Sequence, residues 1–273
     1  MKRKSLLFLL LITFCLPWAA NSQEVTVTIT DLNYESTTIK LPSITNSNYS
    51  STQQIYTIDE IGGKGQIKSI AFKGDKNCTR ELVIYMTDSS KGYFSSTSDY
   101  YTSGTQVFSG SVTFTANEWT TIPLAGNGFT FNRDNLVVIV DDNTGSHSSV
   151  TNWQSFYPSS DRYQALCFYD ETNIDPFSPN ASNSQFVGLK NQIQLAIVPS
   201  GLSAPSLFEP SNISAFGATV SWMAYPYSYL VCYHYQYGPT GGSMSEWFST
   251  TAASVDLTDL ISSTDYTFNV YAE

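Results

Sequence analysis

Short runs of β-branched and aromatic residues recur along most of the chain, and they constrain its fold more than any other feature. The first run, EVTVTITD at residues 24–31, alternates apolar and polar side chains, which is the period of a half-buried strand. Others are QQIYTI, GQIKSIAFKG, RELVIYMTD, QVFSGSVTFT, NLVVIVDD, YQALCFYD and QIQLAIVP, with Gly, Asn, Asp and Ser between them. The chain is therefore predicted to be all-β, with antiparallel strands in a sandwich or a barrel.

The composition agrees with sheet rather than helix and makes the surface acidic. Aromatic residues reach 14% and charged residues only 13%, against ~25% charged in an average domain. Removing Lys2, Arg3 and Lys4, which belong to a leader described next, from the 13 Lys and Arg leaves 10 against 23 Asp and Glu, a formal charge of −13. Such a surface repels phosphate backbones, so no nucleic-acid partner is expected.

The first 22 residues have the pattern of a signal peptide. Three basic residues at 2–4 precede an apolar run at 6–16, and PWAANSQ then offers small residues for cleavage after Ala20 or Ser22. The apolar run is too short for an ordinary membrane span of ~20 residues. The mature chain is expected to be secreted or held at the cell surface, without a transmembrane segment.

Three cysteines follow the leader: Cys78, Cys167 and Cys232. An odd number without a CxxC spacing indicates neither a disulfide framework nor a zinc site. Cys78 and Cys167 could form a pair, but buried free thiols are the favoured interpretation.

A change of pattern marks a domain boundary near VPSGLSAPSLFEP, residues 198–210, where three prolines, a glycine and three serines interrupt the strands. The sequence is therefore divided into four parts after the signal peptide (1–22). These are leading strands or a connector (23–43), a β-sandwich domain (44–198), a linker (199–204) and a second domain (205–273).

The second domain resembles a fibronectin type III module. The residues that carry the resemblance are Pro205, Trp222, Tyr229, Val231, Tyr233, Leu257, Leu260, Thr264, Tyr266, Phe268 and Val270. The resemblance implies an Ig-like sandwich with Trp222 in its core and Tyr266 as the tyrosine corner. Ser262 departs from the family, which often has proline there. The chain also stops after the sixth strand, so the resemblance implies a truncated module that lacks its last strand, and hence a fragment.

The first domain resembles another kind of module. The phrases that carry this resemblance are NSNYSSTQQIYTIDEIGGKGQIKSIAF (46–72), VFSGSVTFTANEWTTIPL (107–124), NLVVIVDDNTGS (135–146) and KNQIQLAI (190–197). They are similar to a sandwich domain that precedes type III repeats in secreted, often surface-attached bacterial proteins of gut and oral anaerobes. Some of those proteins resemble the gingipain adhesin arrays. The resemblance implies a jelly-roll-like accessory module and does not fix a ligand.

The sequence contains no HExxH, GxSxG or Walker motif, so no catalytic site is expected. Cys232 and His234 are two residues apart on one face of a predicted strand. That spacing is ~6.5 Å along the backbone, too far for routine hydrogen bonding, so a Cys–His dyad is not expected. His147 lies in a polar loop and is expected to be solvated.

Two adjacent carboxylates end the run NLVVIVDD and raise the question of a metal site. Asp141 and Asp142 point to opposite faces while the strand continues. At the strand end the chain can turn, and with Asn143 they form a candidate structural Ca²⁺ site. The favoured alternative is an Asx-type turn, in which the carboxylates cap backbone NH groups of DDNTG. A glycosidase pair is less favoured, because the separation from a second acid cannot be read from the sequence.

Aromatic residues in polar loops are the stronger functional signal. The candidate ligand contacts are Trp153, Tyr157, Tyr100, Tyr101 and Asn152. Rigid rings suit stacking on sugars or on a protein partner, and Trp153 has the amide of Asn152 beside it for hydrogen bonds. The alternative is that the loops fold over an end of the sandwich and bury their rings as a satellite cluster, which is favoured for Phe156.

Together these patterns favour an exported, non-catalytic binding or adhesion module for a glycan or a host or matrix protein. One alternative is the accessory N-terminal region of a larger secreted peptidase or glycoside hydrolase, with its catalytic domain beyond this sequence. Another is a structural spacer in a surface array, with no ligand.

Overall fold

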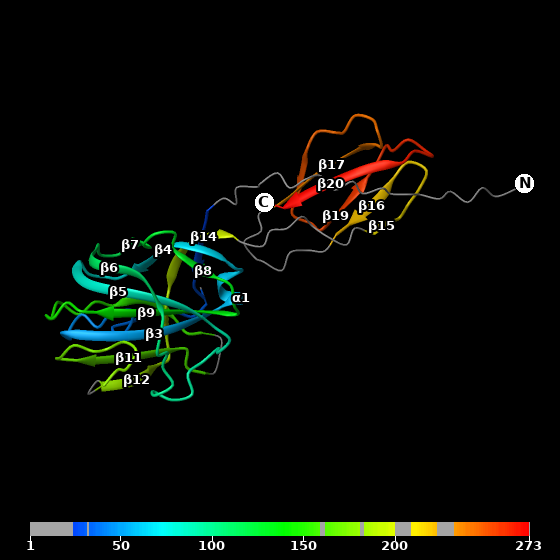
Figure 1. Cartoon of the computed structure of the whole chain (residues 1–273). Helices are drawn as coiled ribbons and strands as arrows, with labels where there is room; N and C mark the ends of the chain where they lie inside the picture. The colour runs from blue at the N-terminus through cyan, green and yellow to red at the C-terminus, as the bar shows by residue number, and fades with distance from the viewer. Residues whose placement is uncertain are drawn as a thin grey trace, which may run out of the picture. The chain divides into compact units, whose positions relative to one another are not determined.

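The computed structural model describes residues 24–31, 33–158, 162–180, 183–199, 209–222 and 232–272. Residues 1–22, with the predicted signal peptide, lie outside the described residues, as do Pro205, Tyr229, Val231 and most of the predicted linker. The chain forms two compact units, Glu24–Ser200 and Gly201–Glu273. Both are built from antiparallel strands, as the sequence predicted (Figure 1).

The first unit contains fourteen strands and one turn of helix within its described residues. They are β1 (Val25–Ile29), β2 (Glu35–Thr38), β3 (Tyr49–Thr57), α1 (Ile58–Ile61), β4 (Gly65–Lys73), β5 (Cys78–Ser89), β6 (Thr105–Phe114), β7 (Trp119–Pro123), β8 (Phe129–Phe131), β9 (Asn135–Asp142), β10 (Trp153–Phe156), β11 (Ala165–Asp170), β12 (Asn183–Val187), β13 (Lys190–Asn191) and β14 (Ile193–Pro199).

A six-stranded sheet in the order β12-β11-β3-β9-β5-β6 organises this unit (Figure 1). Its central strand β9 is buried along its whole length. Because side chains alternate along a strand, Val138 and Val140 point to one face and Val137 and Ile139 to the other. The face of Val138 and Val140, which packs in the main core, is called the inner face, and the opposite one the outer face.

A second layer covers the inner face. It consists of the sheet β1-β14-β4-β7, with β8 paired to β4, and of the small sheet β13-β10-β2. The apolar residues of the two layers meet in the main core, with Tyr56, Ile84, Val138 and Phe114 from the first layer and Ile67, Phe72, Ile122 and Leu195 from the second among its members. The first unit is therefore a β-sandwich.

The leading residues belong to this sandwich rather than to a connector. β1 pairs with β14 from Val25↔Ile197 to Ile29↔Ile193, and β2 pairs with β10 from Glu35↔Phe156 to Thr38↔Trp153. Residues 23–43 thus contain strands, which was one of the two alternatives, and these strands are part of the sandwich rather than a connector. The partners of these strands lie more than a hundred residues further on, which local patterns do not reveal.

The helix α1 is short, but its start is well defined. Thr57 and Glu60 form a capping box, in which each side chain accepts from the backbone NH of the other residue. Glu60 also accepts two hydrogen bonds from Nζ of Lys190, at 2.6 and 2.7 Å. Lys190 is fully buried, so this ion pair satisfies a charge that would otherwise be costly inside the sandwich.

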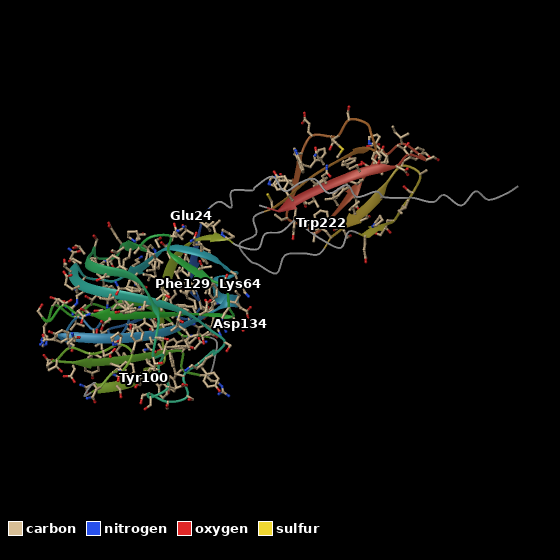
Figure 2. All side chains as sticks on the ribbon, viewed as in Figure 1. Glu24, Lys64, Tyr100, Phe129, Asp134 and Trp222 are labelled. Atoms are coloured by element: carbon tan, nitrogen blue, oxygen red, sulfur yellow. The ribbon has the colours of Figure 1, made fainter. Side chains whose placement is uncertain are left out.

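The described residues of the second unit, 209–222 and 232–272, form two three-stranded sheets. One has the order β15 (Glu209–Ser211), β16 (Ala218–Ser221), β19 (Ser254–Leu257), and the other β18 (Phe248–Thr250), β17 (Tyr233–Pro239), β20 (Tyr266–Ala272). Trp222 (labelled in Figure 2) is buried, with its ring 5.3 Å from that of Tyr233. Tyr266 is buried too, and its hydroxyl accepts a hydrogen bond from the NH of Ile261 at 2.8 Å. These features confirm the predicted type III-like core and its tyrosine corner.

Within the described residues, no helix has the length and apolar character needed to cross a membrane.

Candidate functional site

The outer face of the six-stranded sheet carries an apolar cluster of its own. Its buried members are Ile55, Phe94, Val137, Ile139, Leu166, Phe168 and Ile174. Two loop segments, 90–104 and 171–180, contribute to this cluster and lie against the strands. Gln53 of β3 connects to both, because its Nε2 donates to the carbonyls of Tyr101 and Pro176, each at 3.0 Å. The loops therefore cover the apolar middle of the outer face.

The adjacent carboxylates at the end of β9 lie on opposite faces. Asp142 is fully buried on the inner side, where its Oδ2 accepts from Nε of Arg80 at 2.7 Å and from the hydroxyl of Ser43. Its Oδ1 accepts from the NH of Thr144 at 3.0 Å, which confirms the predicted Asx-type turn. Asp142 therefore does not belong to the candidate Ca²⁺ site of Asp141, Asp142 and Asn143, because it is committed to this network on the face opposite to Asp141.

Asp141 instead lies at a hollow of about 590 Å³ at one end of the outer face. The hollow is lined by Tyr49, Asp141, Asn143, Asn173, Ile174, Asp175 and Pro176. Asp141 is buried and accepts a hydrogen bond from Nδ2 of Asn143 at 2.6 Å, whereas Asp175 and Asn173 are exposed. The hollow thus brings together two carboxylates, two amides and the ring of Tyr49.

The electrostatic environment of the hollow is negative. Burial raises the pKa of Asp141 to about 6 against the opposing hydrogen bond from Asn143, and the charges of Asp142 and Asp175 also raise it. The pKa of Tyr85, on the same face, is likewise raised by burial and then by Asp141 and Asp175. Of the ion pairs formed by the described residues, none includes Asp141 or Asp175.

Two buried oxygens near the hollow lack a hydrogen-bond partner among the described residues. They are Oγ of Ser51 and Oδ1 of Asn143. Ser51 is fully buried and is the register partner of Asp141 across β3 and β9, so the two side chains share the outer face. A buried polar group without a partner costs about 1–3 kcal/mol. Such groups are uncommon in folded proteins and therefore mark a place where a ligand or an ion would find ready contacts.

Trp153 lies in the main core and not in a loop. Its ring is fully buried, 4.8 Å from that of Phe114, and its Nε1 donates to the carbonyl of Ser43 at 2.9 Å. The hypothesis that Trp153 offers a ring to a ligand was therefore wrong, and its ring is buried in the main core rather than in the satellite cluster of the alternative. Phe156 is buried, as the sequence favoured, but it lies in the same main core and not in a satellite cluster.

The other aromatic candidates do not form one surface. Tyr100 (Figure 2) and Tyr101 are half-buried and pack against the outer-face cluster, Tyr100 with its ring 6.0 Å from Phe168. For these two residues the alternative of a satellite cluster under the loops is correct. Tyr157 is exposed. Asn152 is engaged by Asp75, whose carboxylate accepts from its backbone NH at 2.8 Å and from its Nδ2 at 2.7 Å.

The thiol of Cys232 and the imidazole of His234 do meet, contrary to expectation. Sγ of Cys232 lies 2.9 Å from Nε2 of His234, and Nδ1 of His234 lies 3.0 Å from the hydroxyl of Ser249. Cys232 precedes β17 rather than lying within it, so the regular strand spacing used for the expectation does not apply.

His147 is exposed, as predicted, and lies 3.2 Å from the carboxylate of Glu171. Cys78 and Cys167 are both buried free thiols, which resolves the alternative left open.

Sequence reasoning missed four residues of the site: Tyr49, Ser51, Asn173 and Asp175. Tyr49 and Ser51 fall in the run NYSSTQQIY, where alternation places them on one face of a strand. The sequence therefore indicated the strand and its faces, but it did not indicate that this strand pairs with β9. Asn173 and Asp175 lie in a loop without regular periodicity, and nothing in the local sequence places them beside Asp141.

No family model and no curated protein matches the chain. Similar solved structures include the fn3 domain of human collagen alpha-1(XX) chain, 27% identical over 27% of this chain and 71% of that one, with a TM-score of 0.25. A two-domain fibronectin type III segment of chicken tenascin is 13% identical over 76% of this chain and 90% of that one, with a TM-score of 0.27.

Another similar structure holds the cysteine protease and lectin-like domains of Cwp84, a surface layer associated protein of Clostridium difficile. It is 13% identical over 62% of this chain and 37% of that chain, with a TM-score of 0.33. All three TM-scores are low, so the fold rests on the strand order of the chain itself.

Proposed function

We propose that the chain is an exported, non-catalytic binding module that holds a glycan in the outer-face hollow. The observation that carries this proposal is the lining of the hollow, where the ring of Tyr49 lies with carboxylates and amides. An aromatic ring offers a flat face for a sugar ring. Carboxylate and amide groups accept and donate the hydrogen bonds that sugar hydroxyls need, and a few such groups converging in a concavity are typical of sites for small polar ligands.

The same lining favours a glycan over a host or matrix protein. Protein interfaces are larger and depend on apolar or aromatic anchors that become fully desolvated. In the hollow the exposed residues are Asn173 and Asp175, and the carboxylate of Asp141 is buried, while the apolar lining residues Ile174 and Pro176 are buried and offer no exposed anchor. Hydroxyl-rich ligands suit such groups better than an apolar anchor does.

Export and surface location are part of the proposal. They are supported by the leader pattern of residues 1–22. Fractionation of cells that express the full chain, with mass spectrometry of its N-terminus, tests both. Cleavage after Ala20 or Ser22 is the expected result, and an intact leader in the cytoplasm contradicts this part of the proposal.

A glycan array with purified protein tests the binding site. Tyr49→Ala should weaken binding about ten- to a hundredfold, since stacking on an aromatic ring is worth about 1–3 kcal/mol. Asp175→Asn, an exposed position, should weaken binding without changing stability. Tyr157→Ala is the matched control, because it removes an exposed ring outside the hollow. Binding that survives Tyr49→Ala and Asp175→Asn, or that requires a protein ligand, contradicts the proposal.

Hydrolysis assays test the non-catalytic part of the proposal. Two groupings invite a search for activity: Asp141 with Asp175 in the hollow, and Cys232 with His234 in the second unit. Panels of glycosidase and peptidase substrates should show no turnover. Turnover that disappears in Asp141→Asn, or in Cys232→Ala, would show that the chain is itself an enzyme. The accessory region of a larger secreted enzyme remains the alternative, and the sequence downstream in the genome decides it.

A further inference from the structure

Two buried oxygens close to Asp141 receive no hydrogen bond from the described residues. Ser51 and Asp141 are directly opposite each other on neighbouring strands, so their Cβ atoms are about 4.5–5.5 Å apart. Oγ of Ser51 is buried without a partner, and Oδ1 of Asn143, at the lining of the hollow, is buried without a partner as well. Two unpartnered oxygens therefore accompany a buried carboxylate.

The negative charges at the hollow have no cationic partner among the described residues, whereas the neighbouring carboxylate of Asp142 has one. Asp142 lies next in the chain and has Arg80 at 2.7 Å. Asp141 and Asp175 line the same hollow, and neither takes part in an ion pair among the described residues. Asp175 uses Oδ1 to accept from the NH of Phe177 at 2.9 Å, which fixes its carboxylate and leaves Oδ2 for another contact. Two carboxylates that share a hollow favour a cation between them.

We propose that the hollow binds a hard divalent cation of the Ca²⁺ class through Asp141, Asn143, Asp175 and Ser51. All four donors are oxygens, which suits Ca²⁺ and excludes the nitrogen and sulfur sets typical of zinc. Ca²⁺ takes about 6–8 oxygens in flexible geometry, with water among them, whereas Mg²⁺ demands a tighter octahedron. The hollow has room for such waters. The donors come from β3, from the end of β9 and the residue after it, and from the loop 171–180, so a bound ion would tie this loop to the sheet.

The proposal goes beyond glycan binding and does not depend on it. Calcium titration of the purified chain after treatment with EDTA tests it, with Tm as one readout and Tb³⁺ luminescence, sensitised by nearby tyrosines such as Tyr49, as the other. Millimolar Ca²⁺ should raise the Tm by several degrees, since an ion that binds only the folded state stabilises it. The same concentration of Mg²⁺ should have a smaller effect.

Three variants test which residues bind the ion. Asp175→Asn changes an exposed residue and should weaken Ca²⁺ binding at least tenfold without changing the Tm in EDTA. Ser51→Ala removes one neutral donor and should weaken binding less. Asp59→Asn is the matched control, since it removes an exposed carboxylate on α1, outside the hollow.

Each outcome decides the proposal. It stands if Ca²⁺ binding falls in Asp175→Asn and Ser51→Ala but not in Asp59→Asn. It is overturned if Ca²⁺ changes neither the Tm nor the luminescence, or if all three variants bind as the wild type does. Ca²⁺ binding without any glycan ligand would leave this proposal intact and refute the proposed function. Glycan binding that is unchanged in EDTA and lacks a Ca²⁺ response would do the reverse.

Discussion

The inner and outer faces of the six-stranded sheet differ in the partners that they provide for buried polar and charged residues. On the inner face the buried charge of Asp142 has a cation, a hydroxyl and a backbone NH as partners. On the outer face Asp141 has the amide of Asn143, and Ser51 beside it has no partner among the described residues. On the inner face, the protein's own groups therefore satisfy the buried charge of Asp142. The apolar middle of the outer face is covered by loops, but at its end buried polar groups lack partners. A ligand could bind at this end.

The largest expected effect concerns the main core, in which the second layer packs against the inner face. Trp153→Ala should destabilise the first unit by about 4–5 kcal/mol, because it removes a buried ring and leaves the carbonyl of Ser43 without its donor. Tyr100→Ala, at a half-buried ring of the outer face, is the comparison and should cost about 1–2 kcal/mol. Urea unfolding of the two variants measures the difference. Equal losses would contradict the distinction between the faces.

The next effect concerns the buried ion pair of the inner face. Arg80→Met should cost about 3–4 kcal/mol, because it leaves the carboxylate of Asp142 buried without its cation. The double variant Arg80→Met, Asp142→Leu should recover part of this loss, since no charge is then left unpaired. Chemical denaturation of both single variants and the double variant completes the cycle. A double variant that is as unstable as the sum of the singles would show that Asp142 acts mainly through Ser43 and Thr144.

Much of the fold could be predicted from the sequence, because it depends on local periodicity. The run NLVVIVDD predicted β9, and the type III-like positions predicted the burial of Trp222 and Tyr266. Even the opposed directions of Asp141 and Asp142 followed from strand alternation. These features need no knowledge of which strand pairs with which.

Features that depend on distant partners could not be predicted in this way. Trp153 stands in a polar context that reads as a loop, yet it bridges to Gly74 and pairs with Thr38. A Cβ at Gly74 would lie 3.0 Å from the ring of Trp153 and 2.7 Å from Thr151, so the burial of this ring requires a glycine far away in the sequence. Asp175 lines the same hollow as Asp141 for the same kind of reason, because a distant loop folds against the sheet.

A third prediction compares the two adjacent carboxylates directly. In EDTA at neutral pH, Asp141→Asn should raise the stability of the first unit by about 1 kcal/mol, because a buried charge without a cationic partner opposes folding. The neutral amide can still accept the hydrogen bond from Asn143. Asp142→Asn should instead lower stability, since it leaves Arg80 buried without its anion. If both substitutions lower stability equally, the two faces do not differ in how their charges are matched.

The smallest expected effect concerns the loop that covers the outer face. Lys91 donates to Asp99 at 2.7 Å, and the backbone NH of Ser95 donates to the same carboxylate at 2.9 Å. The hydrogen bond from Lys91, followed by that from Ser95, lowers the pKa of Asp99 from 3.8 to about 2. Because the folded pKa lies below the unfolded one, the ionised carboxylate stabilises the folded state above pH 3.8, and this contribution is lost as the pH falls to about 2.

The carboxylate of Asp99 is 29% exposed, so solvent screening limits its contribution to about 1 kcal/mol or less. The free energy of unfolding of the wild type should exceed that of Asp99→Asn by this amount at pH 6, and the difference should shrink towards zero near pH 2. Other carboxylates titrate in both proteins, so the difference isolates Asp99. Hydrogen exchange at the amide of Ser95 gives a local readout, which should quicken in the variant while the amides of β9 stay protected. A difference in stability that is independent of pH would show that the loop is held by the outer-face cluster around Phe94, and not by this surface pair.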